Sequence, residues 1–437
     1  MMRVGGLPVK KSILLSLIAV LMANGLLFAS ASAEKPIAVS DRGSVTGEIR
    51  VPELKPKWSL SVNNFIDNAI AEDGLVFLVA DKKLIAIDAN TGKIKYRYGS
   101  NLTDNYVYAA GIVYGTTANG KAFALNARTG AQKWLNAISK TPGTVSVVGD
   151  TVYYAEGKRT YALNAATGKT KWVSEEPQAE GSAFGITVAN GIVFQSYLVQ
   201  GALTSTQLDA FDAKTGKKLW GVFHQNTPLT VRNGVVYSVY DPYPSPDDDP
   251  ARNVTINAFD ATTGKLMASQ VFSWKIASAP PYHVSGGSVL LEGNDLYITT
   301  DVEVRKYDFA SYKVDGKPLQ TWVKPDAEAE FAGPVNGGRL FFSRYGSGEV
   351  LGLKLLDGKS LIWYADNPVV ATTIYGNGVY VSQSDGVLRG YRLDTREPVF
   401  NVHTGSRYFG STLKTGNTLI IQTPGKLTAV TIPKSML

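Results

Sequence analysis

The chain has 437 residues, of which 44% are apolar and 19% are charged, and its formal net charge is +7. This is the composition of an ordinary globular protein that is long enough to bury a large core. The chain contains no cysteine, which excludes disulfides, thiol nucleophiles and thiolate metal sites.

The N-terminal residues 1–33 are a predicted targeting segment. An apolar run occupies residues 13–28, and small residues end the segment at Ala33. The positive charge of the segment comes from Arg3, Lys10 and Lys11. The alternative is a membrane anchor, but the run is short for a span. We expect cleavage near Ala33, no stable membrane span afterwards, and a secreted or extracytoplasmic protein of the cell envelope.

Without this segment the chain keeps 41 basic and 37 acidic residues, and no basic run occurs. This mild charge does not predict nucleic-acid binding. We expect a linker over residues 34–57 and a single domain over residues 58–434.

One nine-residue pattern recurs along the chain, at residues 88–96, 126–134, 164–172, 212–220 and 260–268. Each copy begins with the turn D/N-A-x-T-G, here called the signature turn. Its Asp or Asn can accept hydrogen bonds from backbone N–H groups two residues on, and its Gly permits a positive φ. The turn glycines are Gly92, Gly130, Gly168, Gly216 and Gly264.

A large aromatic residue follows each of the first four turn glycines by four positions, and similar residues occur elsewhere in the chain. These residues, here called the interblade aromatics, are Trp58, Tyr96, Trp134, Trp172, Trp220, Trp322 and Trp363. A flat ring at one fixed place in every unit is expected to pack against the neighbouring unit.

Each repeat reads as four short strands joined by turns, without helical periodicity. In the third copy, strands are predicted over residues 141–148, 151–154 and 160–163, followed by the strand that carries Trp172. The second strand of the unit occurs nine times along the chain, from residues 74–77 to residues 417–420.

The last unit ends at Val430 without its aromatic strand, whereas residues 57–60 form an aromatic strand without a unit. These two parts complete one another if the array closes into a ring. The predicted fold is therefore all-β, a single closed β-propeller of four-stranded antiparallel blades whose N-terminal strand closes the ring.

The pattern G-x-V-Y followed by D/N-A-x-T-G-K-x-x-W resembles the pyrroloquinoline-quinone-type propeller repeat. This repeat is found in quinoprotein alcohol dehydrogenases and, without cofactor, in BamB-like outer-membrane assembly factors. The resemblance covers residues 58–434 and implies the fold rather than an activity. Such rings usually have eight blades, whereas nine units are counted in this chain.

The resemblance also states what a quinone site would need. In the dehydrogenases the cofactor is held by a vicinal disulfide, a stacking Trp and a calcium ion. This chain has no Cys, and six of its seven Trp residues are repeat positions. We therefore predict no cofactor and no quinone-dependent dehydrogenase.

No catalytic or metal site is predicted from motifs. The three histidines, His224, His283 and His403, lie in different units without metal-ligand spacing. The acidic run 247–249 lies between prolines and is predicted to be a solvated loop tip.

Three neighbouring segments depart from the repeat, at residues 196–206, 240–252 and 265–293. Hairpin loops and interblade connections of a propeller emerge on the same face, so these insertions are expected to converge. The alternative is drift, because loops accept insertions at low cost. The candidate binding face comprises Tyr197, Tyr240, Tyr243, Trp274, Tyr282 and His283.

We therefore predict an exported, monomeric, non-enzymatic scaffold that binds a protein in the cell envelope or outside the cell. The lipid-anchoring Cys of the outer-membrane assembly factor is absent. The alternatives are a polysaccharide-binding module and a propeller-type polysaccharide lyase or hydrolase.

Overall fold

Strands account for nearly all of the regular structure in the computed structural model. It describes residues 51–62, 68–176, 183–199, 205–241, 249–276, 287–311, 317–343 and 349–437. The predicted targeting segment 1–33 and the linker residues 34–50 lie outside the described residues.

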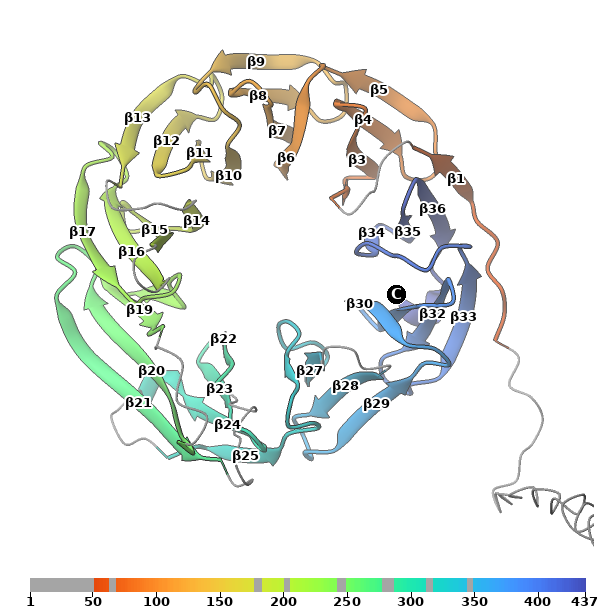
Figure 1. Ribbon diagram of the computed structural model, residues 1–437. Coiled ribbons are helices and arrows are strands. Elements are labelled where there is room, and N and C mark those ends of the chain that lie inside the picture. The colour runs from red at the N-terminus through yellow and green to blue at the C-terminus, as the bar shows by residue number, and fades with distance from the viewer. Residues whose placement is uncertain are drawn as a thin grey trace, which may run out of the picture. The chain divides into compact units, whose positions relative to one another are not determined.

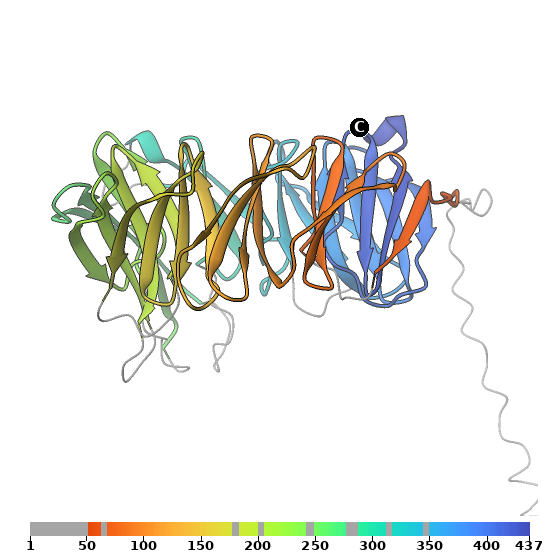
Figure 2. The same cartoon turned by 90° about the horizontal axis from the view of Figure 1, so that it is seen from above.

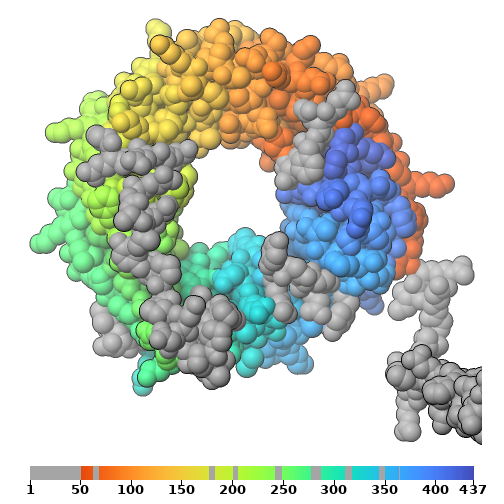
Figure 3. Space-filling view, viewed as in Figure 1, coloured from red at the N-terminus to blue at the C-terminus, as the bar shows by residue number. Residues whose placement is uncertain are grey.

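The strands form nine four-stranded antiparallel sheets. The sheets are arranged as blades around a ring in the order of the sequence (Figure 1), and Figure 3 shows the open centre that they surround. The predicted all-β propeller is confirmed, and the ring has nine blades rather than the eight that are usual for the repeat.

The blades are numbered in chain order, with the innermost strand of each blade given first. Blade 1 consists of β2 (Ile70–Glu72), β3 (Leu75–Ala80), β4 (Lys83–Asp88) and β5 (Ile94–Tyr98). Blade 2 consists of β6 (Leu102–Ala109), β7 (Ile112–Thr117), β8 (Lys121–Asn126) and β9 (Gln132–Ala137). Blade 3 consists of β10 (Thr144–Val148), β11 (Thr151–Glu156), β12 (Arg159–Asn164) and β13 (Thr170–Glu175). Blade 4 consists of β14 (Ala183–Ala189), β15 (Ile192–Val199), β16 (Ser205–Asp212) and β17 (Lys218–Phe223). Blade 5 consists of β18 (Thr230–Arg232), β19 (Val235–Val239), β20 (Ala251–Asp260) and β21 (Leu266–Lys275). Blade 6 consists of β22 (Val289–Glu292), β23 (Asp295–Thr299), β24 (Glu303–Asp308) and β25 (Gln320–Val323). Blade 7 consists of β26 (Glu330–Phe331), β27 (Arg339–Ser343), β28 (Glu349–Lys354) and β29 (Ser360–Tyr364). Blade 8 consists of β30 (Val369–Tyr375), β31 (Gly378–Gln383), β32 (Val387–Arg392) and β33 (Pro398–His403). Blade 9 consists of β34 (Leu413–Thr415), β35 (Thr418–Thr423), β36 (Lys426–Thr431) and β1 (Trp58–Ser61).

Two 3-10 helices, η1 (Phe309–Ser311) and η2 (Lys434–Met436), complete the regular elements of the described ranges. Within the described residues, no helix has the length and apolar character needed to cross a membrane.

The first strand of the described chain closes the ring, as its orphan position in the sequence predicts. β1 pairs antiparallel with β36, so that Trp58 lies opposite Ala429. The contact continues upstream, where the backbone N–H of Leu54 donates to the carbonyl oxygen of Asn401 at 2.9 Å. At the other end, Met436 of η2 is fully buried against blades 8 and 9. The described ring therefore extends beyond residues 58–434 at both ends.

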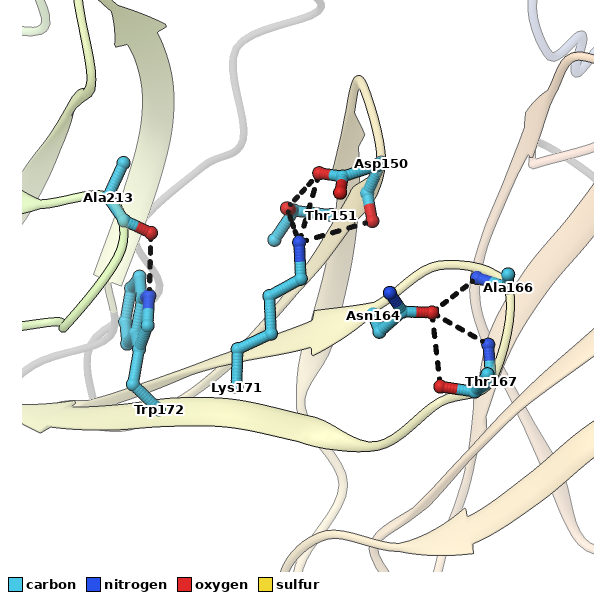
Figure 4. A network of polar contacts seen from close by, with 8 residues as sticks. All are labelled: Asp150, Thr151, Asn164, Ala166, Thr167, Lys171, Trp172 and Ala213. Carbon is cyan, nitrogen blue, oxygen red and sulfur yellow. Dashed lines mark hydrogen bonds and ion pairs between the residues drawn. The ribbon is translucent and has the colours of Figure 1, made fainter.

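The signature turn is held by the side chain of its first residue, which accepts hydrogen bonds from backbone N–H groups of the turn. Asn164 Oδ1 accepts hydrogen bonds from the backbone N–H of Ala166 and from the backbone N–H and hydroxyl of Thr167, at 3.0 to 3.1 Å (Figure 4). Asp88, Asn126, Asp212 and Asp260 make the same bonds in their blades. Gly168 then adopts a φ of 71°, which favours glycine.

The interblade aromatic of each of the first blades closes on the signature turn of the next blade. Trp172 Nε1 donates to the carbonyl oxygen of Ala213 at 2.8 Å (Figure 4), and a Cβ atom on Gly216 would lie 2.6 Å from the indole. Equivalent pairs join Trp58 to Ala89, Tyr96 to Ala127, Trp134 to Ala165 and Trp220 to Ala261. In the later blades Trp322 packs over Gly358, and Trp363 Nε1 donates to the carbonyl oxygen of Arg392 at 3.5 Å.

Candidate binding site at the edge of blades 4 and 5

Blades 4 and 5 differ from the other blades in the length of their strands. β15 and β16 have eight residues each, and β20 and β21 have ten, whereas the corresponding strands of blades 1 and 3 have five or six. Much of the predicted insertion 196–206 therefore extends the β15–β16 hairpin. The predicted connection 265–293 is corrected in the same way, because it contains β21 (Leu266–Lys275) and β22 (Val289–Glu292).

A group of polar side chains, here called the polar edge cluster, lies beside the extended ends of these strands: Ser205, Thr206, His224, Tyr240 and Asp241. The Ser205 hydroxyl lies 2.7 Å from His224 Nδ1. Asp241 Oδ2 accepts hydrogen bonds from the hydroxyl of Thr206 at 3.1 Å and from its backbone N–H at 3.3 Å. Because Asp241 follows β19 and Ser205 begins β16, the cluster joins blade 5 to blade 4.

Backbone contacts hold the cluster in place. His224 donates its backbone N–H to Thr206 at 2.7 Å, and its carbonyl oxygen accepts from Asp241 N–H at 2.8 Å. His224 has a φ of 58°, which a non-glycine residue seldom adopts. The imidazole ring lies 5.7 Å from the ring of Tyr240. The half-buried cluster thus offers a carboxylate, hydroxyl groups, an imidazole and an aromatic ring at one fixed place on the rim.

A second polar group lies deeper, in the interface between blades 3 and 4. This buried ion cluster consists of Glu176, Asp209 and Lys218. The carboxylates of Glu176 and Asp209 have relative exposures of 2% and 0%. Lys218 Nζ lies 3.0 Å from Asp209 Oδ2 and also forms an ion pair with Glu176. Gln207 Nε2 donates to Asp209 Oδ1 at 2.8 Å.

Within the buried ion cluster, the charges do not balance when both carboxylates are ionised, because Lys218 is its one cation. Burial raises the pKa of Asp209 to about 7, and its hydrogen bond with Glu176 acts in the same direction, while Lys218 and Gln207 oppose the shift. Burial disfavours the charged form of Lys218, but the two carboxylates outweigh it and raise the pKa of this amine.

Asp209 breaks the repeat at a position that is apolar or aromatic in the first three blades. Three residues before the start of the signature turn, those blades carry Ile85, Phe123 and Tyr161. Asp209 lies on β16 together with Ser205 and Thr206 of the polar edge cluster, so the departures from the repeat gather in one sector of the ring. The sequence analysis assigned no site to His224 and missed Asp209 and Glu176, although aligning the repeats position by position would have found Asp209.

The structure places the residues of the predicted binding face in different environments. Tyr240 belongs to the polar edge cluster. Tyr197 and Trp274 are not on an exposed face, because their relative exposures are 0% and 8%. The inserted residues continue β15 and β21, and alternate side chains of these strands point into the interblade core. Tyr243, Tyr282 and His283 lie outside the described residues.

The other predicted features add no site. His403 Nε2 lies 3.1 Å from a carboxylate oxygen of Glu53 on the exposed surface. Of the predicted acidic loop tip, residues 247 and 248 lie outside the described residues, and Asp249 Oδ1 accepts the backbone N–H of Ala251 at 2.8 Å. Across the described part of the chain, no three His, Asp or Glu side chains are grouped to hold a metal ion.

A closed ring of four-stranded blades, joined by an aromatic residue that packs on the next signature turn, defines a β-propeller protein of the quinoprotein-like type. The model of one family, described as outer membrane protein assembly factor BamB, matches residues 31–152, 140–248 and 252–434. These ranges cover most of the chain, and the protein belongs to this family.

Several solved structures have a similar fold. BamB from Moraxella catarrhalis is 14% identical, with 87% of this chain and 98% of that chain covered and a TM-score of 0.46. A europium-containing methanol dehydrogenase is 14% identical, with 87% and 93% covered and a TM-score of 0.47. The computationally designed Ika8 protein is 13% identical, with 85% and 98% covered and a TM-score of 0.47. These similarities concern the fold alone. The comparison with curated proteins finds no match.

Proposed function

We propose that this protein is an extracytoplasmic, non-enzymatic scaffold that binds another protein at the polar edge cluster of blades 4 and 5. The observation that carries the proposal is the place of this cluster. Its side chains gather beside the ends of strands that are extended beyond the six residues typical of the repeat.

The chemistry of the cluster suits recognition of polar groups on a partner. Asp241 and Ser205 can exchange hydrogen bonds with such groups, and Tyr240 adds a flat apolar surface with a polar tip. The blade framework holds these groups rigidly, which lowers the entropy lost on binding. The family description, an outer membrane protein assembly factor, supports a partner among envelope proteins.

Site-specific photo-crosslinking tests the proposal. A photo-reactive amino acid replaces Tyr240 in the full chain, expressed in the source organism. The matched control carries it at Tyr408, an exposed tyrosine (67%) that follows β33 and therefore lies on the same face of the ring, in a distant blade. We expect a protein adduct of defined mass from position 240 and none from position 408.

A second variant checks that the cluster itself is responsible. Asp241→Ala removes the carboxylate that binds Thr206, and we expect it to weaken the adduct at position 240 at least tenfold. Equal adducts from positions 240 and 408 would contradict the proposal. A carbohydrate adduct at position 240 would instead favour the polysaccharide-binding alternative.

A further inference from the structure

The two faces of the ring differ in what they present. Every signature turn joins the third strand of a blade to its fourth, so all of these turns lie on one face, here called the turn face. The extended ends of β15 and β16 in blade 4, and of β20 and β21 in blade 5, lie on the opposite face. The C-terminal helix η2 follows the third strand β36 and marks the turn face as the upper edge in Figure 2.

Exposed lysines recur at one position of the turn face. A lysine follows the signature-turn glycine in four of the first five blades, and each of them is exposed: Lys93, Lys169, Lys217 and Lys265. Arg128 adds an exposed cation to the turn of blade 2, the one of the five without this lysine, and Lys359 adds one to blade 7. The blades thus place cations around the rim at the spacing of the repeat.

The lysines are not used to hold the fold. Among the contacts of the described residues, none of the four lysine side chains makes a hydrogen bond or an ion pair. Other lysines are paired on both faces: Lys171 with Asp150 and Lys354 with Asp357 on the turn face, and Lys158 with Glu175 on the opposite face.

The acidic residues of the turn face offset this charge only in part. In blades 1 to 5, on and beside its turns, this face carries the acidic residues Glu72, Asp73, Asp88, Asp150, Asp212 and Asp260 and the basic residues Lys93, Arg128, Lys169, Lys171, Lys214, Lys217, Arg232 and Lys265. Asp88, Asp212 and Asp260 begin the turns of blades 1, 4 and 5, where each carboxylate is engaged by its own turn. Blades 2 and 3 begin their turns with Asn126 and Asn164, which are neutral.

We infer that the turn face docks on a planar anionic surface, namely a bilayer that exposes anionic phospholipid headgroups. Cations at equivalent positions of successive blades lie on one face and can approach a plane together, whereas a single linear polymer would follow only part of the arc. Each lysine near such a surface strengthens binding by about fivefold, within a screening distance of about 10 Å. This docking leaves the polar edge cluster on the opposite face, directed away from the membrane.

Vesicle co-sedimentation tests the inference with three full-length proteins. The first is the wild type, and the second combines Lys93→Gln, Lys169→Gln, Lys217→Gln and Lys265→Gln. The matched control combines Lys82→Gln, Lys83→Gln, Lys140→Gln and Lys275→Gln, which removes the same charge from exposed positions on the opposite face. Because the N-terminal segment is the same in all three proteins, differences between them report on the ring.

We expect wild type and control to bind vesicles of phosphatidylcholine and phosphatidylglycerol better than vesicles of phosphatidylcholine alone, and less in high salt. The turn-face variant is expected to bind the anionic vesicles at least tenfold more weakly. Equal losses in both variants, or no preference of the wild type for anionic vesicles, would overturn the inference. Retention on an acidic polysaccharide that the turn-face variant alone loses, without vesicle binding, would assign the face to a polymer instead.

Discussion

The indole Nε1 of Trp172 donates a 2.8 Å hydrogen bond to the carbonyl oxygen of Ala213, 41 residues away in the next blade. The same ring covers Gly216, at which no larger residue fits without displacing the indole. One side chain therefore provides apolar burial, a directed hydrogen bond and a steric match to the neighbouring turn. This combination explains why the turn and the aromatic residue recur together.

Trp172→Ala is expected to destabilise the ring by about 3–5 kcal/mol, the usual cost of truncating a buried aromatic residue. The loss comprises the buried area, the cavity and the unpaired carbonyl of Ala213. Trp172→Phe keeps an aromatic side chain at this position and should lower the free energy of unfolding by less. Urea unfolding followed by tryptophan fluorescence and circular dichroism measures both. An alanine variant as stable as the wild type would mean that the blades do not depend on this contact.

Gly168→Ala is expected to be more costly than Gly191→Ala, although both glycines have a similar positive φ of 71° and 76°. At Gly191 a Cβ atom meets nothing within 4 Å, so only the backbone term of about 1 kcal/mol applies. At Gly168 it would lie 2.5 Å from Trp134, and overpacking brings the total cost to about 3 kcal/mol. The difference between the two melting temperatures isolates the steric term, and equal values would contradict it.

The fold could be predicted because the residues that form one blade recur along the sequence. The turn signal of Asn164 to Gly168 and the aromatic residue at Trp172 recur, and their period indicates the ring. The missing strand of the last unit and the unattached Trp58 strand predict the closure, which the pairing of β1 with β36 confirms.

The candidate site was harder to predict because it consists of departures from that period. Tyr197 and Trp274 looked like loop residues in the sequence, but their segments continue strands and bury them. Asp209 is a single departure from the repeat inside one strand. Only its contacts with Glu176 and Lys218 show that it belongs to a buried ion cluster. Those contacts cross between blades, which a one-dimensional pattern cannot show.

Removal of the closing strand is expected to make the protein associate. A chain that begins after residue 62 lacks β1, which leaves the edge of β36 unpaired beside the apolar core of blades 9 and 1. Unpaired edges pair with other chains. The matched control begins at Val51 and keeps β1. Size-exclusion chromatography should give oligomers or aggregate for the shorter chain and a monomer for the control, and two monomers would contradict the role of closure.

The stability of the ring is expected to fall as the pH rises through the range in which Asp209 titrates. Its folded pKa of about 7 lies above the unfolded value of about 3.9. A group with a raised pKa stabilises the fold fully below the unfolded value, and this contribution is lost as the pH rises through the folded value. The groups that face Asp209 are Glu176 from the end of blade 3, Lys218 from β17 and Tyr197 from β15.

Thermal melts at several values between about pH 5 and pH 8 measure this slope. Asp209→Asn removes the titration while keeping the shape of the side chain, and we expect its melting temperature to vary less with pH than that of the wild type. Asp260→Asn is the matched control, because hydrogen bonds from Thr262 and Thr263 hold the pKa of Asp260 at about 2, so that its contribution is lost only as the pH falls well below this range. Parallel pH profiles for the wild type and Asp209→Asn would mean that the proton is not held at Asp209.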